Sequence, residues 1–86
     1  MHDDTALNMA IRPNPVRDQL AVRYTSDTPD DVRISILDAK GQIIRQHTSY
    51  PIGEDILLDV NDLAQGFYFI QLSSGDTQLV EKFVKQ

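Results

Sequence analysis

Apolar and polar residues alternate along most of the chain with a period of two. Within residues 19–24, for example, Leu20, Val22 and Tyr24 share one face, and a small or charged residue stands between each of them. Such alternation is typical of a strand with one buried face, because successive side chains of a strand point to opposite sides. The pattern predicts about seven short strands, over residues 6–11, 19–24, 31–38, 42–47, 55–60, 66–72 and 79–85.

One of these segments is apolar on both faces. In residues 66–72, Tyr68 and Ile70 fall on one face, and Phe67 and Phe69 fall on the other. This composition is typical of a strand that is covered on both sides. We therefore expect this segment to be a central strand with both of its faces covered.

Turn-forming residues separate the predicted strands. Pro13 and Pro15 precede the second strand, Gly41 allows a short hairpin after Asp38, and Gly66 allows a tight corner. No segment has a helical stripe, so the fold class is all-β. Short strands with such turns predict an immunoglobulin-like antiparallel β-sandwich of about seven strands. Its expected core includes Val22, Ile34, Ile36, Leu58, Leu63, Tyr68 and Ile70.

The composition allows one small domain. The chain has 86 residues, of which 41% are hydrophobic, and this content is enough for a packed core. We expect residues 11–86 to be the domain and residues 1–10 to be a linker or a lead-in to the first strand. Within the latter, residues 1–6 are expected to be disordered. The absence of cysteine removes disulfides, thiolate chemistry and Cys-ligated zinc.

Charge and hydropathy exclude two classes of partner. With 13 acidic and 8 basic residues, the formal charge of −5 would repel a phosphate backbone, so no nucleic-acid binding is expected. No apolar run approaches the ~20 residues of a membrane span, so no membrane insertion is expected. The N-terminal residues lack the pattern of a secretory signal, which for an exported protein would have to lie upstream.

Candidate chemistry is sparse. His2 lies in an acidic terminus, where a mobile end is favoured over a metal site, and His47 has no evident paired nucleophile. Asp27, Asp30 and Asp31 could hold calcium, but their spacing matches no ligand template, so a hydrated loop is favoured. We therefore expect no catalysis, no bound metal and no cofactor.

Two short motifs predict how the sandwich turns its corners. At residues 13–15, Asn14 is restricted by the proline that follows it and can close a turn with its own side chain. Further along, Leu63 and Gly66 precede Tyr68 at a strand start. This spacing is similar to the tyrosine corner of immunoglobulin-like sandwiches, in which the phenol bonds back to the upstream backbone. We expect the Tyr68 hydroxyl to reach the backbone of residues 61–65.

Taken in order, four stretches resemble a known family. They are "PNP" at 13–15, "SILDAKGQII" at 35–44, "LDVNDLAQGFYFIQL" at 58–72 and "EKFVK" at 81–85. This order resembles the C-terminal sorting domain of type IX secretion substrates of Gram-negative bacteria, from about Ile11 to Gln86. The resemblance places the family motif, and with it the expected recognition residues, on Pro13, Asn14, Pro15, Asp38, Gly41, Leu63, Gly66, Tyr68, Lys82, Phe83 and Lys85.

The resemblance implies a function without catalysis. Such a domain directs a larger cargo protein across the outer membrane through the type IX translocon. A surface signal peptidase usually then removes the domain. The implied partners are this translocon and this peptidase, and the implied location of the cargo is the cell surface or the medium, after transit through the periplasm. A homodimer through an edge strand is also compatible with the pattern.

The resemblance also gives the last strand a role. We expect its edge to offer backbone donors and acceptors for recognition, with Lys82 and Lys85 in solvent to discourage promiscuous pairing. The alternative function, from another class, is an immunoglobulin-like adhesion or carbohydrate-binding module. Sugar modules usually expose an aromatic platform, and Tyr50 is the one aromatic residue outside core parity. A single aromatic residue more often packs over a core edge.

Overall fold

The computed structural model describes residues 8–25, 32–49, 55–75 and 77–86. These residues form seven strands and no helix. This confirms the all-β prediction. The strands are β1 (Asn8–Arg12), β2 (Gln19–Thr25), β3 (Val32–Leu37), β4 (Ile43–Ser49), β5 (Ile56–Asp59), β6 (Gly66–Ser74) and β7 (Thr77–Lys85).

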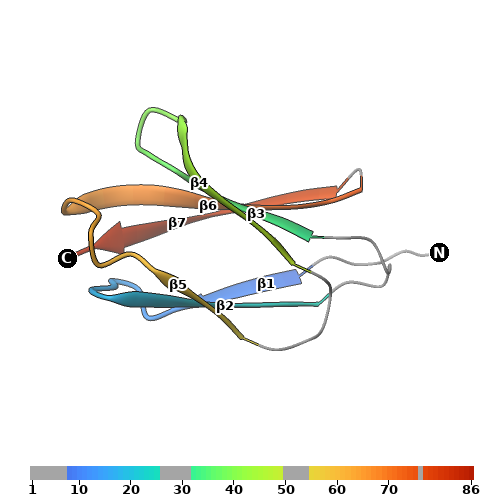
Figure 1. Ribbon diagram of the computed structural model, residues 1–86, viewed down its shortest axis with the longest axis horizontal. Helices are drawn as coiled ribbons and strands as arrows, with labels where there is room; N and C mark the ends of the chain where they lie inside the picture. Colours follow the sequence, from blue (N-terminus) through green and yellow to red (C-terminus); the bar gives the residue numbers. More distant parts are fainter. Residues whose placement is uncertain (1–7, 26–31, 50–54, 76) are drawn as a thin grey trace.

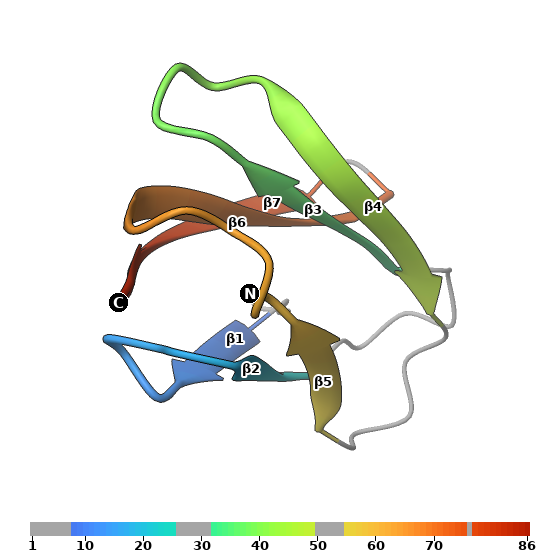
Figure 2. The same cartoon turned by 60° about the vertical axis from the view of Figure 1, so that its left-hand side comes forward.

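The strands form two antiparallel sheets that pack face to face. One sheet has the order β1-β2-β5, and the other has the order β4-β3-β6-β7. Figure 1 shows the two sheets as separate layers, and Figure 2 shows the strands of the larger sheet fanning out above β1, β2 and β5. The predicted β-sandwich is therefore confirmed.

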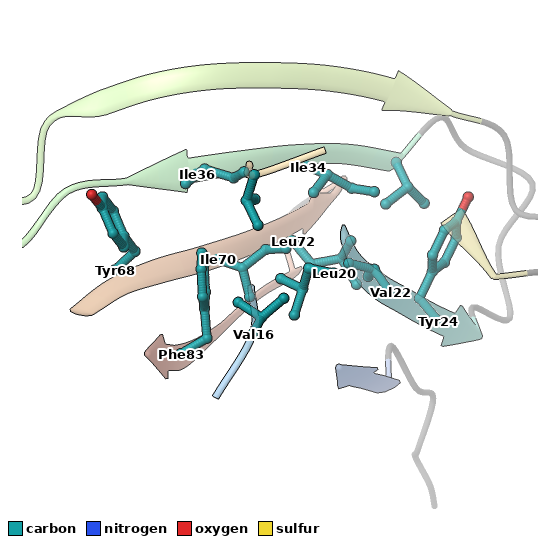
Figure 3. Packing of buried hydrophobic residues seen from close by; sticks show 12 residues of the cluster. Val16, Leu20, Val22, Tyr24, Ile34, Ile36, Tyr68, Ile70, Leu72 and Phe83 are labelled. Carbon is teal, nitrogen blue, oxygen red and sulfur yellow. The ribbon is translucent and has the colours of Figure 1, made fainter. Parts of the chain in front are cut away.

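The core lies between the two sheets, where side chains from alternate strand positions meet (Figure 3). This is the outcome that the period of two requires, because only one face of each sheet points inward. The buried apolar residues are Val16, Leu20, Val22, Tyr24, Val32, Ile34, Ile36, Val60, Tyr68, Ile70, Leu72 and Phe83.

Two residues of the expected core are less buried than predicted. Leu58 and Leu63 pack against the core but are only partly buried. Leu58 lies on β5, which forms one edge of the smaller sheet, and Leu63 lies in the connection that follows it. Leu58 has a neighbouring strand on one side only, and Leu63 lies outside the strands, so neither side chain is fully covered.

The outer face of β6 differs from the prediction. The strand lies between β3 and β7, as expected for a central strand. Its inner face is buried, but on the outer face Phe67 is 45% exposed and Phe69 is partly buried. Within the described residues nothing covers this outer face, so the expectation of cover on both sides is wrong.

Three connections and the last residue gather at one end of the sandwich. Figure 1 shows the β1–β2, β3–β4 and β5–β6 connections at the end where the chain finishes. This end therefore holds most of the residues of the family motif. Several other predictions, on His2, Asp27, Asp30, Asp31 and Tyr50, and on the disorder of residues 1–6, fall outside the described residues.

Candidate functional site

The segment between β1 and β2 is bound to the last strand of the other sheet. The N–H of Val16 donates to the carbonyl oxygen of Val84 at 2.8 Å, and the N–H of Gln86 donates to the carbonyl oxygen of Val16 at 2.8 Å. These bonds make Val16 a one-residue parallel strand against Lys85. The Val16 side chain is fully buried beside Phe83 (Figure 3). Residue 16 thus joins the two sheets.

Asn14 extends this pairing with its side chain. Its Oδ1 accepts a hydrogen bond from the N–H of Val84 at 2.9 Å, and its Nδ2 donates to the carbonyl oxygen of Lys82 at 3.3 Å. A side-chain amide has one acceptor and one donor group, as a peptide unit does. Asn14 therefore pairs with β7 as a neighbouring strand would.

These bonds correct the expectation for the last strand. The expectation is that this edge offers free backbone groups. Instead, the carbonyl oxygen of Lys82, both backbone groups of Val84 and the N–H of Gln86 are bonded to Asn14 or Val16. Backbone groups of alternate residues point to the same side of a strand. Gln78 and Val80 also direct their backbone groups outward. Asn14 and Val16 do not cover this earlier part of the β7 edge.

Lys85 also differs from the prediction. Its side chain was expected in solvent, yet the residue is only 7% exposed. It follows Phe83 by two positions and therefore shares the inward face of β7. Its Nζ donates to the backbone oxygen of Gln86 at 3.0 Å. With Arg17 and Gln65, these two residues line a hollow of about 460 Å³ at the end of the sandwich.

The tyrosine corner is present as predicted. The hydroxyl of Tyr68 donates to the carbonyl oxygen of Ala64 at 2.7 Å. Gly66, between them, has a φ of +147°, which side-chain-bearing residues rarely adopt. The Tyr68 ring stacks on Phe83, with ring centroids 5.6 Å apart and planes 23° apart. The corner is therefore in direct contact with the last strand.

The predicted hairpin between β3 and β4 forms around one carboxylate. Asp38 Oδ1 accepts hydrogen bonds from the N–H groups of Lys40 at 2.9 Å and Gln42 at 3.0 Å. Gly41 has a φ of +88°, which its lack of a Cβ allows. This hairpin and residues 65–68 of the corner line a shared hollow of about 320 Å³.

The motif residues therefore fall into two adjoining groups at one end of the sandwich. The Pro-Asn-Pro segment contacts the edge of β7, and the corner contacts both β7 and the Asp38 hairpin. The strand order places β6 between the β3–β4 hairpin and β7. The hairpin and residues 13–15 thus lie toward opposite edges of the larger sheet, and Tyr68, on β6, lies between them.

Sequence reasoning missed two ionic contacts. Arg45, on β4, donates to the backbone oxygen of Asp59 and to the carboxylate of Asp62, which ties the two sheets together on their β4–β5 side. The hydrogen bond from Arg45 lowers the pKa of Asp62 below its usual value. A signal was available, because Arg45 stands opposite the buried Ile36 and so faces the interior.

The second missed contact lies on the smaller sheet. Arg12 and Arg23 both donate to the carboxylate of Asp55, at 2.7 Å and 2.9 Å. The pKa of Asp55 is lowered, chiefly by the hydrogen bond from Arg23. These contacts are surface ion pairs, which solvent and salt screen, so each typically contributes little to the free energy of unfolding.

The described residues show little catalytic apparatus. No group of three or more His, Cys, Asp or Glu side chains among them could hold a metal ion. His47 is exposed and lines a hollow of about 410 Å³ between β4 and β5 with Leu58 and Asp59. The described part of the chain also includes no helix long and apolar enough to cross a membrane.

Comparison with known families decides the identity of this unit. Residues 10–86 match the family described as the secretion system C-terminal sorting domain. The chain belongs to this family. The resemblance seen in the sequence is therefore confirmed, and with it a role as a sorting signal of type IX secretion. No curated protein matches the chain.

Membership in the sorting-domain family supports three general statements. The domain interacts with the type IX secretion machinery, and the cargo of such a domain is secreted or attached to the cell surface. The family is not known for catalysis. Most of the motif residues that the resemblance implies lie on β7, beside it or in the corner, whereas Asp38 and Gly41 lie in the β3–β4 hairpin.

Proposed function

We propose that this sorting domain directs a larger cargo protein from the periplasm across the outer membrane through the type IX translocon, and that a surface signal peptidase then removes it. In this role residues 11–86 are the recognised unit, and residues 1–10 connect it to the cargo. The domain itself catalyses nothing. The family match is the main support for this proposal.

The structure suggests which part of the domain is recognised. The observation that supports this most is the pairing of Asn14 and Val16 with the last strand, because it joins two motifs that lie far apart in the sequence. Tyr68 adds the third motif through its stack on Phe83. In this proposal the translocon binds the folded end of the sandwich. An unfolded C-terminal segment alone is not sufficient for recognition.

This proposal predicts that recognition depends on folding. Phe83 is fully buried, so a chain without it would lose core packing and the partner of Tyr68. Deleting a buried aromatic side chain typically costs ~3–5 kcal/mol. For a small domain whose free energy of unfolding is about 5–15 kcal/mol, such a loss is severe.

The test is an export assay. A reporter enzyme with an N-terminal export signal is fused to the full chain and produced in a type IX-competent host. We expect the reporter outside the outer membrane, whereas the same fusion in a host without the translocon, and the reporter without the chain, stay in the periplasm. Equal surface delivery with and without the chain would contradict the proposal.

A further inference from the structure

The outer face of the larger sheet carries exposed apolar side chains at its motif end. Along β6 and β7 the residues that alternate with the buried ones point outward. Among them, Phe67 is 45% exposed, Val84 is 39% exposed and Val80 is 56% exposed. Ile43, at the start of β4, is 53% exposed. Several large apolar residues thus face away from the core.

The strand register makes these residues neighbours. Leu37 lies opposite both Ile43 and Phe69, and Phe67 lies opposite Val84. The rings of Phe67 and Phe69 meet edge to face, with centroids 6.3 Å apart. We call this surface the outer patch, and it consists of Leu37, Ile43, Phe67, Phe69 and Val84.

The outer patch continues into a hollow. Phe67 also lines the hollow of about 320 Å³ between the Asp38 hairpin and the corner. A flat apolar surface beside a hollow of this kind can receive a protruding apolar side chain. Aromatic anchors in such hollows often provide most of the affinity of a protein interface.

Two lysines lie at the outer patch and its hollow. Lys82 Nζ lies 4.5 Å from the centre of the Phe67 ring, which is a cation–π contact. Lys40 lines the hollow. The Asp38 carboxylate lines the same hollow, and its Oδ1 accepts two hydrogen bonds from its own hairpin. Although the chain has a formal charge of −5, it presents Lys82 and Lys40 at this apolar surface.

We propose that the outer patch docks a protein surface that places apolar side chains on Phe67 and the hollow and carboxylates beside Lys82 and Lys40. This inference rests on the proposed function, since the partner is a component of the type IX machinery. Electrostatic complementarity of this kind sets orientation and partner choice. A second copy of this chain fits less well, because two patches face to face would bring lysines together.

The experiment uses the export assay with the full chain and two pairs of variants. Phe67→Ser removes an aromatic anchor of the patch, and Leu57→Ser is its matched control, since Leu57 is 61% exposed on the other sheet. Lys82→Glu reverses a charge, and Lys82→Arg retains it. Thermal melts of the purified domains show whether each variant is folded.

We expect Phe67→Ser and Lys82→Glu each to lower the exported fraction by at least about tenfold, because losing one anchor commonly reduces affinity that much. Leu57→Ser and Lys82→Arg should be exported like the parent. Since Lys82 is exposed, the Lys82 pair tests the inference even if Phe67→Ser weakens the fold.

The outcomes separate this inference from the proposed function. If the parent domain is not exported, the proposed function fails and the docking partner fails with it. If the parent is exported and folded Phe67→Ser and Lys82→Glu variants are exported equally well, the inference alone is overturned. A parent dimer in light scattering that Phe67→Ser dissociates would instead assign the outer patch to a second copy.

Discussion

Asn14 Oδ1 accepts a hydrogen bond from the backbone N–H of Val84 at 2.9 Å, although 70 residues separate them in the sequence. The same amide donates to Lys82 on the other side of Phe83. An exposed strand edge is open to pairing with other chains, and natural proteins usually cover or block it. Here a single side chain covers part of that edge, so Asn14 both closes the sandwich and limits what can pair with β7.

Replacing Asn14 should therefore destabilise the domain. Asn14→Ala removes one acceptor and one donor from the β7 edge, and a net hydrogen bond typically contributes about 0.5–1.5 kcal/mol. We expect the free energy of unfolding to fall by about 1–2 kcal/mol in urea titrations. Asn61→Ala is the control, because Asn61 is exposed and uses its backbone N–H in its bond to Asp59. Equal losses for both variants would contradict this role.

The tyrosine corner gives a second prediction. Tyr68→Phe keeps the ring and its stack on Phe83 and removes only the hydroxyl that donates to Ala64. The loss should be on the order of 1 kcal/mol, the usual size of one net hydrogen bond. Thermal melts of the two proteins, analysed as free energies at a common temperature, measure it. Two proteins of equal stability would show that the hydroxyl bond contributes nothing net.

The strands and the corner could be predicted because their signals are local. The alternation around Val22 and Ile34 indicates which face is buried, and both residues are buried. The spacing from Gly66 to Tyr68 indicates a corner, and the phenol bonds to Ala64 as expected. Each of these signals lies within a few residues of the contact that it predicts.

Contacts between distant segments could not be predicted in the same way. Nothing near Asn14 indicates that its amide will bond to β7, because the partner is chosen by the packing of two sheets. Apolar residues on both faces of β6 indicate that each face can pack against another surface. They do not indicate whether this chain or a partner covers Phe67. Lys85 was misplaced for another reason. Its charge suggested solvent, whereas its parity with Phe83 correctly indicated the interior.

The Asp55 contacts predict how stability responds to acid. The pKa of Asp55 is lowered in the folded state, mainly by the hydrogen bond from Arg23, from a usual value of 3.8. A lowered pKa means that the carboxylate contributes stability above the unfolded-state pKa and loses it as the pH falls through the folded-state pKa. The loss should therefore appear below about pH 4.

Asp55→Asn tests this dependence. The variant cannot ionise at position 55, so its urea midpoint should fall less steeply than that of the parent below about pH 4. Asn61→Ala, which changes no ionisable group, is the comparison and should retain the parent's slope. Added salt should shrink the difference at neutral pH, because Arg12 and Arg23 are largely exposed. Parallel pH profiles for all three proteins would exclude a role for Asp55.

The two lysines of the last strand should behave differently. Lys82 is exposed on the outer face, so Lys82→Ala should change the free energy of unfolding by less than ~0.5 kcal/mol. Lys85 is 7% exposed and its Nζ bonds to the backbone oxygen of Gln86, so Lys85→Ala loses packing of the stem as well as a hydrogen bond. We expect that variant to lose about 1–2 kcal/mol. Urea titration measures both values.

This difference determines how recognition can be separated from folding. Deleting residues 81–86 removes Phe83 as well, so loss of export would have two explanations. A double substitution of both lysines has the same fault, because Lys85 supports the fold. Lys82→Ala alone is informative. If it melts like the parent and stays in the periplasm, Lys82 is recognised directly. If Lys82→Ala is exported normally, direct recognition of Lys82 is excluded. If Lys85→Ala is then retained only in proportion to its loss of stability, Lys85 acts through the fold.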